Sequence, residues 1–143
     1  MVYLDTSSLL KLIWQEQESE IVAEYVNREE AVLISSLVEL ESKIQITAGH
    51  LRGDYPLLLS RRLRRELDRL LSSEPFQRCT LSGGVFDLAN HQHTRYGLNG
   101  FCRTLDRIHL AAMEELGLTR LITNDLKQAE AAGALGFIAE IPA

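Results

Sequence analysis

The sequence predicts an α/β fold in which a short parallel sheet is covered by helices on both faces. Two observations carry this prediction. Short apolar runs of strand length alternate along the chain with longer segments whose apolar residues recur at helical spacing. The apolar runs are nearly continuous, which is typical of parallel strands buried on both faces. The 143 residues, 45% of them hydrophobic, suffice to bury a core, and we expect one domain over residues 1–143.

Each expected element follows from its local pattern. Apolar runs predict strands over residues 2–5, 31–34, 79–81, 120–123 and 137–141, the third of which is the weakest. Helical spacing predicts a helix through Leu9 and Ile13, then helices over residues 18–28, 36–48, 56–71, 83–96, 104–116 and 125–135. Thr104 is expected to cap the helix that starts there, with Gly117 at its stop position.

Composition excludes several functional classes. The apolar run after Met1 stops at Asp5, which argues against a signal peptide, and residues 9–14 are too short to span a bilayer. Cys79 and Cys102 form no CxxC motif, so zinc and a disulfide framework are poorly supported. We therefore expect a soluble, cytoplasmic protein with no membrane contact.

The acidic net charge is a weak objection to nucleic-acid binding. The chain has 15 Lys and Arg against 20 Asp and Glu, a formal charge of −5. If four of these acids bind metal, the remaining acids and bases nearly balance. The local arrangement of the bases then matters more than the total charge.

Four carboxylates occupy unusual places: Asp5, Glu41, Asp106 and Asp125. Asp5 and Asp125 close apolar runs, where the carboxyl ends of parallel strands commonly form sites. Glu41 and Asp106 fall inside the apolar stripes of helices. Acids are rarely placed so close to a core without a neutralising partner, and no matching set of buried bases exists in the sequence. The pattern points to a bound divalent cation.

Asp5 and Asp125 each have a simpler reading as the N-cap of the following helix. For Asp5 a cap does not require an acid, because Thr6 and the serines after it cap equally well. Asp125 is followed by Gln128 in the spacing of a capping box, so its capping alternative stays open.

The second acid requires a choice between Glu39 and Glu41. Glu39 has two structural explanations, a capping box that begins at Ser36 and an i,i+4 ion pair with Lys43. Glu41 has neither, and it shares an apolar stripe with Ile44. We therefore favour Glu41.

Asp106 lines up with Leu110 and Met113 on the face of its helix that should turn inward. An acid in the first turn also complements the helix dipole, but this alternative does not explain the inward direction. His109, three residues on, is a candidate for a supporting role, as are the polar groups Thr6, Ser7, Thr123 and Asn124, which commonly hold waters or carboxylates around a metal.

The joint order of these acids resembles the PIN-domain nucleases, and most closely the VapC-type toxin ribonucleases of toxin–antitoxin pairs. The likeness is carried by YLDTS at residues 3–7, ISSL at 34–37 with Glu41, DRIHLAA at 106–112 and LITND at 121–125. It spans almost the whole chain. Arg107 departs from the family pattern, which usually has a small residue there.

The resemblance implies that the four acids are catalytic and hold Mg²⁺, for which Mn²⁺ may substitute. It implies endonucleolytic hydrolysis of RNA by a metal-activated water, leaving a 5′-phosphate and a 3′-hydroxyl. It also implies a cognate antitoxin protein as partner and a homodimer. Oxygen ligands suit Mg²⁺, and no His or Cys stands out as a nucleophile.

Substrate phosphates should meet scattered bases. Arg103, Arg107 and Lys127 lie beside the acids in the sequence and are the preferred candidates. The densest basic cluster follows Pro56, where a solvated helix face is the alternative explanation; it comprises Arg61, Arg62, Arg64, Arg65 and Arg69. Aromatic residues do not interleave with bases, so we expect recognition by shape and backbone.

Two further classes remain as alternatives. One is a catalytically silent PIN-like module that binds RNA or a protein, against which the presence of all four acids argues. The other is a phospho-acceptor signalling domain, which needs a central strand-end Asp and a Lys on a late strand. Neither the acceptor Asp nor the late-strand Lys is clear in the sequence.

Overall fold

The computed structural model describes all residues 1–143 and contains one sheet of five parallel strands. The strands lie in the order β3-β2-β1-β4-β5, so β1 is central and β2 and β4 flank it. Tyr3 of β1 pairs with Leu33 on one side and with Leu121 on the other. The strands are β1 (Val2–Leu4), β2 (Val32–Ser35), β3 (Phe76–Cys79), β4 (Arg120–Ile122) and β5 (Ile138–Glu140).

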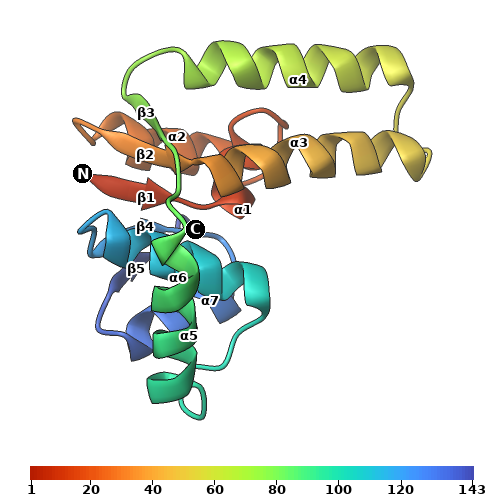
Figure 1. The fold of residues 1–143 in the computed structure, drawn as a ribbon. Helices are drawn as coiled ribbons and strands as arrows, with labels where there is room; N and C mark the ends of the chain where they lie inside the picture. The colour runs from red at the N-terminus through yellow and green to blue at the C-terminus, as the bar shows by residue number, and fades with distance from the viewer.

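Seven helices connect the strands and cover both faces of the sheet. Helices α1 to α4 lie on one side of it and α5 to α7 on the other (Figure 1). This arrangement confirms the predicted α/β architecture. The helices are α1 (Thr6–Lys11), α2 (Ser19–Asn27), α3 (Ser36–Leu51), α4 (Leu57–Leu71), α5 (Gly84–Tyr96), α6 (Thr104–Glu115) and α7 (Leu126–Ala134).

The core is built around β1 and its two neighbours in the sheet, β2 and β4. All three residues of β1 and the last two of β4 are buried, because helices cover both faces there. They belong to one cluster of 27 buried hydrophobic residues. The edge strand β3 is different, since Gln77 and Arg78 are exposed. Our expectation of a strand at residues 79–81 was displaced by three residues because this polar edge strand carries no apolar run.

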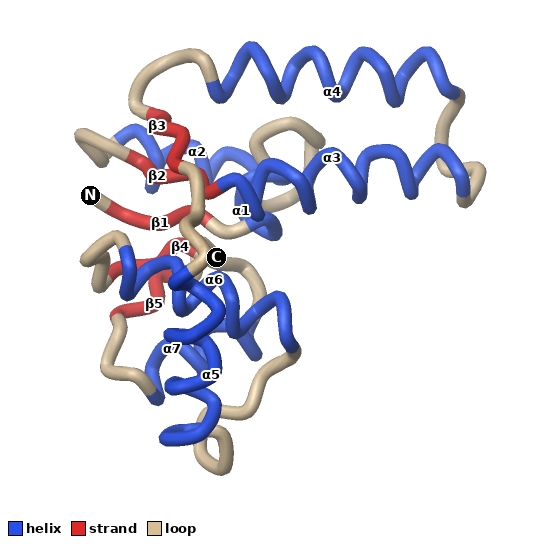
Figure 2. The backbone as a smooth tube through the Cα atoms, viewed as in Figure 1, coloured by secondary structure: helices blue, strands red, loops and turns tan.

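Helices α3 and α4 pack against each other and extend beyond the sheet as a long pair (Figure 2). On α4, Leu63, Leu67 and Leu71 are buried, whereas the five arginines of this helix are exposed. The arginine cluster is therefore the polar face of an amphipathic helix.

Helix starts differ from the expectation at two places. Ser35, not Ser36, caps α3, and its hydroxyl accepts a hydrogen bond from the Val38 N–H at 3.2 Å. Arg103, not Thr104, holds the N-cap position of α6, and it makes no side-chain cap. In both cases the sequence offers adjacent polar residues, and backbone direction decides between them. No helix combines the length and apolar character needed to cross a membrane.

Candidate active site

The site lies where the strand order reverses. From β1 the chain continues to β2 on one side, whereas β4 adds to the opposite side of β1. Loops leaving β1 and β4 therefore diverge and leave a crevice at the carboxyl ends of these strands, which is where ligands bind in open α/β sheets. The Asp5 N–H donates to the Ile122 carbonyl at 3.2 Å, which holds the two strand ends together.

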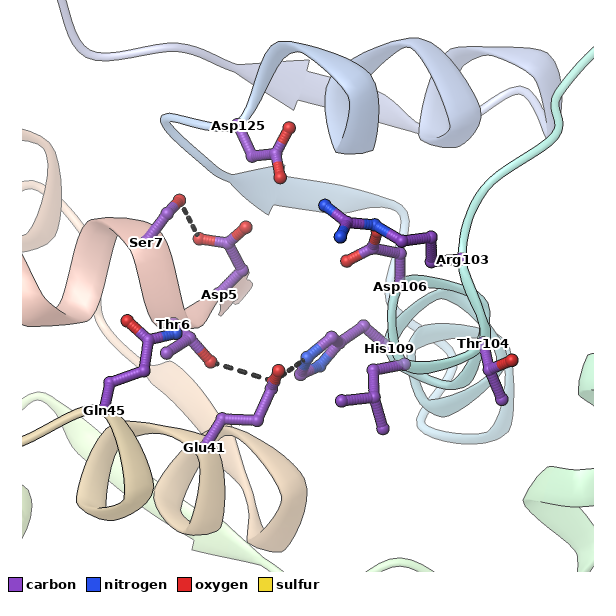
Figure 3. A pocket seen from close by; sticks show the side chains of 11 residues that line it. Asp5, Thr6, Ser7, Glu41, Gln45, Arg103, Thr104, Asp106, His109 and Asp125 are labelled. Atoms are coloured by element: carbon purple, nitrogen blue, oxygen red, sulfur yellow. Dashed lines mark hydrogen bonds and ion pairs between the residues drawn. The ribbon is translucent and has the colours of Figure 1, made fainter. Parts of the chain in front are cut away.

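All four predicted acids line one pocket of about 620 Å³ in this crevice. Figure 3 shows them converging from four segments of the chain: Asp5 after β1, Glu41 on α3, Asp106 on α6 and Asp125 after β4. The full lining is Asp5, Thr6, Ser7, Glu41, Gln45, Arg103, Thr104, Leu105, Asp106, His109 and Asp125.

Asp5 is held by three donors at the floor of the pocket. Its carboxylate accepts the Ser7 hydroxyl at 2.7 Å, the Ser8 N–H at 3.2 Å and the Thr123 hydroxyl. The residue is only 5% exposed, and burial raises the pKa of Asp5 although these three hydrogen bonds oppose the rise. Asp5 thus caps α1 and also faces the pocket, so the two readings are compatible.

Two backbone groups set the direction of the hydroxyls that reach Asp5. The Ser7 oxygen accepts the Asn124 N–H at 3.0 Å, and the Thr123 oxygen accepts the Asp125 N–H at 3.0 Å. With their oxygens occupied in this way, both hydroxyls are free to donate their protons to the carboxylate. The loop after β4 therefore organises the acid that follows β1.

Asn124 joins the same loops without entering the pocket. Its side-chain oxygen accepts the Ser8 hydroxyl at 2.7 Å, and its amide donates to the Pro142 carbonyl at 2.8 Å. Asp125 caps α7 by accepting the N–H groups of Lys127 and Gln128. Like Asp5, it serves as a cap and lines the pocket.

Glu41 projects from α3 into the pocket, whereas Glu39 does not. The Glu41 carboxylate accepts the Thr6 hydroxyl at 3.1 Å and contacts the His109 ring. Burial raises the pKa of Glu41, but His109 and Thr6 more than offset this effect, so that the net shift is downward. Glu39 instead pairs with Lys43 at 3.5 Å and Arg78 at 3.2 Å.

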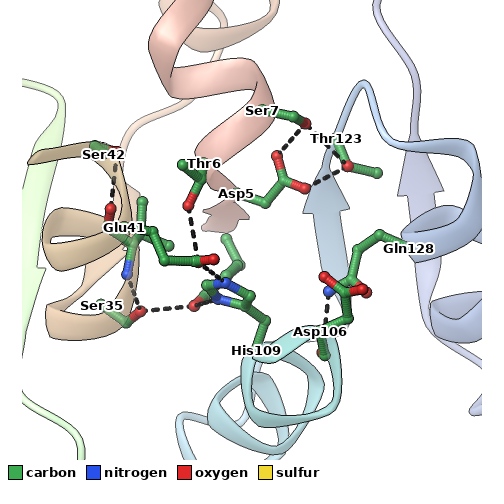
Figure 4. Close-up of polar contacts among 12 residues, drawn as sticks. Asp5, Thr6, Ser7, Ser35, Glu41, Ser42, Asp106, His109, Thr123 and Gln128 are labelled. Atoms are coloured by element: carbon green, nitrogen blue, oxygen red, sulfur yellow. Dashed lines mark hydrogen bonds and ion pairs between the residues drawn. The ribbon is translucent and has the colours of Figure 1, made fainter. Parts of the chain in front are cut away.

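A buried chain of hydrogen bonds stands behind Glu41 (Figure 4). The Tyr3 hydroxyl lies 2.6 Å from the Ser35 hydroxyl and 2.7 Å from Nδ1 of His109, and Nε2 of the same ring meets Glu41. Burial raises the pKa of Tyr3 far above its usual value, so the phenol keeps its proton.

The donors and acceptors of this chain fit one direction. The Ser35 oxygen already accepts the Val38 N–H, so its proton is best used toward Tyr3. Tyr3 then donates to Nδ1 of His109, and Nε2–H donates to Glu41. In this arrangement Nδ1 of His109 accepts and Nε2 donates, and every polar group of the chain has a partner.

Asp106 has no comparable support. Its carboxylate lines the pocket but accepts no hydrogen bond from the protein, and only its backbone carbonyl is engaged, by Gln128 at 3.2 Å. Burial raises the pKa of Asp106 and the charge of Asp125 adds to the rise, against smaller opposing effects of His109 and Arg103. It is the least compensated acid of the four.

The three predicted phosphate-binding bases lie in different positions relative to the pocket. Arg103 is exposed and lines the pocket. Lys127 is exposed on α7 but does not line it. Arg107 is only 5% exposed and donates to the Gly100 carbonyl at 2.5 Å and to Gln92 at 3.4 Å, which contradicts our expectation that it meets substrate. It instead ties α6 to α5 and to the loop that joins them.

Sequence reasoning missed Gln45 and underrated His109. Gln45 lies four residues after Glu41, so it shares a helix face with this acid, and that spacing was a usable signal. The place of His109 between Tyr3 and Glu41 had no such signal. It depends on two long-range contacts, one with a residue 106 positions away in the sequence and one with a residue 68 positions away.

The donor set fits a hydrated hard cation rather than a closed protein cage. No group of three His, Cys, Asp or Glu side chains is arranged so that it could hold one metal ion by itself. Mg²⁺ usually keeps several waters and binds through one or two carboxylates. The pocket supplies oxygen donors, and burial raises the pKa values of Asp5 and Asp106, an effect that a bound cation would oppose.

This fold and this acidic crevice define a PIN domain, and the family profile of the PIN domain matches residues 2–134. The chain belongs to this family. Within it, the chain is 31% identical over 150 residues to ribonuclease VapC35 of Mycobacterium tuberculosis, covering 99% of this chain and 97% of the relative. It is 32% identical over 144 residues to ribonuclease VapC46 of the same organism, with the same coverage of both chains. The VapC-type resemblance is confirmed.

Solved structures share the fold at lower sequence identity. VapC20 of Mycobacterium tuberculosis, a toxin that cleaves the sarcin–ricin loop, matches with a TM-score of 0.70 at 16% identity, over 96% of this chain and 97% of that chain. VapBC2 of Rickettsia felis, solved bound to a promoter DNA fragment, matches with a TM-score of 0.71 at 17% identity, over 99% and 98%. A toxin–antitoxin complex from Klebsiella pneumoniae gives 0.70 at 17% identity, over 100% and 98%.

Proposed function

We propose that this protein is a Mg²⁺-dependent endoribonuclease and the toxin of a type II toxin–antitoxin pair. The observation that carries the proposal is the meeting of Asp5, Glu41, Asp106 and Asp125 in one pocket at the switch point of the sheet. The membership in the VapC branch of the PIN family supports it. An RNA substrate implies a cytoplasmic location.

The four carboxylates would hold the cation. Asp5 and Asp106 would be its principal ligands, because three hydrogen bonds fix the direction of the first and no protein donor occupies the second. When bound, Mg²⁺ (or Mn²⁺) lowers the pKa of a water molecule and neutralises charge on the leaving oxygen. The water oxygen attacks the phosphorus, the bond to the 3′ oxygen breaks, and that oxygen takes up a proton. The products are a 5′-phosphate and a 3′-hydroxyl.

The remaining residues position this chemistry. Ser7 and Thr123 fix the Asp5 carboxylate, and Thr6 and His109 fix Glu41. Such hydrogen bonds to ligand carboxylates orient them and commonly change activity by about 10–100-fold when removed. Arg103, at the rim, is placed to neutralise a substrate phosphate.

We further propose that a cognate antitoxin protein covers the pocket and that the protein forms a homodimer. The match to solved toxin–antitoxin complexes supports the antitoxin. Exposed apolar side chains on α3 and α4, such as Ile44 at 57% and Leu58 at 74%, leave surface for protein partners.

The alternative is a silent module that binds RNA or a protein without cutting. One experiment separates the two functions. Purified protein is incubated with structured RNA in Mg²⁺, with and without EDTA, beside an Asp5→Asn variant. The proposal expects cleavage that EDTA and the substitution both abolish. RNA binding without any cleavage beyond the Asp5→Asn background would instead assign the silent module.

A further inference from the structure

A second hollow of about 460 Å³ adjoins the acidic pocket. The two share three lining residues, Ser7, Gln45 and Asp125, so they lie side by side. Its volume falls within the range of about 300–1,000 Å³ that is typical of ligand sites. A chain bound at the acids can therefore continue into this hollow.

The walls of the two hollows differ in chemistry. In the acidic pocket Leu105 is the single apolar lining residue. The second hollow is lined by Trp14, by Leu10, and by Leu126, which is 64% exposed. Trp14 is partly buried and packs against the core, so one part of the indole is anchored while another faces the hollow. We call this hollow the Trp14 pocket.

The loop that carries Trp14 is held in place by its own contacts. The backbone N–H of Trp14 donates to the Leu10 carbonyl at 2.9 Å, and the Ser19 hydroxyl donates to the backbone carbonyl of Trp14 at 2.8 Å. Lys11 pairs with Glu16 at 2.7 Å and with Glu18 at 3.0 Å across the same loop. A platform that is already ordered loses little entropy when a ligand stacks on it.

Charge decides which part of an RNA suits this hollow. Lys11 pairs with both Glu16 and Glu18, which leaves this group with one excess negative charge, and Asp125 adds another to the lining. A phosphate is therefore disfavoured there. A nucleobase is neutral, presents a flat π face, and stacks on aromatic side chains regardless of its sequence.

We propose that the Trp14 pocket holds the base of a nucleotide next to the scissile phosphate of a single-stranded or looped RNA. The proposal rests on the proposed ribonuclease function and names a subsite for its substrate. Gln45 is exposed at the boundary of the two hollows and its amide makes no hydrogen bond within the protein, so it is free to meet the edge of this base. The Asn124 amide, in contrast, is already engaged by Ser8 and Pro142.

Trp14 is the only tryptophan in the chain, so its fluorescence reports on this hollow alone. The experiment titrates a mixed-sequence single-stranded RNA oligonucleotide, in Mg²⁺, into an Asp5→Asn protein that does not cleave it. Binding is followed in parallel by anisotropy of a dye on the RNA. We expect quenching of Trp14 fluorescence that saturates together with the anisotropy.

Matched variants separate stacking from packing. Trp14→Leu keeps an apolar side chain against the core and should weaken RNA binding about thirtyfold, the middle of the range for loss of one base–aromatic stack. Trp14→Phe keeps a stacking ring and should bind within about threefold of the parent. Phe86→Ala, which removes an exposed aromatic outside both hollows, should bind as the parent does. In cleavage assays Trp14→Leu should raise KM more than it lowers kcat.

The outcomes distinguish this proposal from the proposed function. Cleavage by the wild-type protein with unchanged Trp14 fluorescence, or with normal binding by Trp14→Leu, overturns the base subsite and leaves the ribonuclease intact. A fluorescence change caused by the antitoxin but not by RNA assigns the Trp14 pocket to the protein partner and equally overturns it. If the wild-type protein neither binds nor cleaves RNA, the function itself fails.

Discussion

The phenol of Tyr3 and the imidazole of His109 meet beneath the acidic pocket, with Oη 2.7 Å from Nδ1 and the rings 5.9 Å apart in an edge-on arrangement. This contact joins the central strand of the sheet to α6, and through His109 it reaches Glu41. An acid at the surface of the site is thus held by a group in the core.

Tyr3→Phe tests this support. The change removes one hydroxyl from a fully buried position and leaves Nδ1 of His109 without its donor, which should cost about 1–3 kcal/mol of unfolding free energy. Activity should fall about tenfold because His109, which contacts Glu41, loses the hydroxyl that orients its ring. Thermal unfolding and kcat are the measurements, with Tyr25→Phe on α2 as the control. An active Tyr3→Phe protein with wild-type kcat would show that the chain of hydrogen bonds only stabilises the fold.

Glu41→Gln should impair cleavage far more than Glu39→Gln. Glu41 lines the pocket, whereas Glu39 is engaged by Lys43 and Arg78 outside it. We expect a loss of at least about 100-fold for the first change and less than about threefold for the second. Initial rates on one RNA substrate measure both. The reverse order would mean that the inward-facing acid of α3 is not the functional one.

Asp106→Asn should stabilise the protein in the absence of metal. Because the folded-state pKa of Asp106 is raised, its ionised form is disfavoured in the fold, and stability contributed by this group is lost as pH rises through that pKa. At neutral pH the neutral amide removes this penalty. A gain of about 1 kcal/mol corresponds to a rise in Tm of about 4 °C.

Glu41→Gln is the contrasting variant in the same assay. The folded-state pKa of Glu41 is lowered, so its ionised form stabilises the fold above its unfolded pKa, and this contribution is lost as pH falls through the folded pKa. Its replacement should therefore lower Tm at neutral pH. Equal Tm shifts of the same sign for Asp106→Asn and Glu41→Gln would contradict the difference in their surroundings.

Binding of Mg²⁺ should strengthen as pH rises. The raised pKa values of Asp5 and Asp106 mean that protons compete with the cation at a higher pH than for ordinary aspartates. The rise in Tm on adding Mg²⁺ should grow as the pH increases above the ordinary titration range of aspartate in the wild-type protein, and it should be largely lost in Asp106→Asn. A Mg²⁺ effect that is constant above this range would argue against a site built on these two acids.

Arg103→Ala should raise KM for RNA about threefold to tenfold, whereas Lys127→Ala should leave it unchanged. Both bases are exposed, but only Arg103 lines the pocket. Loss of one phosphate contact should also reduce the salt dependence of binding by about one unit of slope. A comparable loss in both variants would place the RNA across α7 as well as α6.

Sequence reasoning was effective where a residue's neighbours lie within one turn of its own helix or strand. The strand-end positions of Asp5 and Asp125 are such cases, and both line the pocket. Glu41 lines the pocket too, but the apolar stripe that led to its choice is not the buried face of α3, because Ile44 is 57% exposed. Arg107 shows where this reasoning ends. It follows Asp106 directly, but successive helical residues point about 100° apart, so the neighbour of a pocket residue faces elsewhere. Which helix it then meets depends on the packing of α5 against α6.

The order of the strands in the sheet could not be predicted from local sequence patterns either. Nothing local to Tyr3 or His109 reveals that they touch, because their contact requires β1 to lie between β2 and β4 and α6 to cover that part of the sheet. The same applies to Trp14, whose closeness to the acids depends on how the loop after α1 folds back.

The wide spread of the four acids along the chain bears on how the protein is made. The first lies at residue 5 and the last at residue 125, and the loop that carries Asp125 is held by strand β5 through the bond from the Thr123 N–H to the Glu140 carbonyl at 3.0 Å. While the chain is still being translated, the pocket lacks its last acid, Asp125, and the Thr123 hydroxyl that donates to the first. On the ribonuclease function proposed above, we therefore expect a nascent chain to be inactive until β5 has left the ribosome. Activity would then begin at the end of synthesis, when a partner protein can already be present.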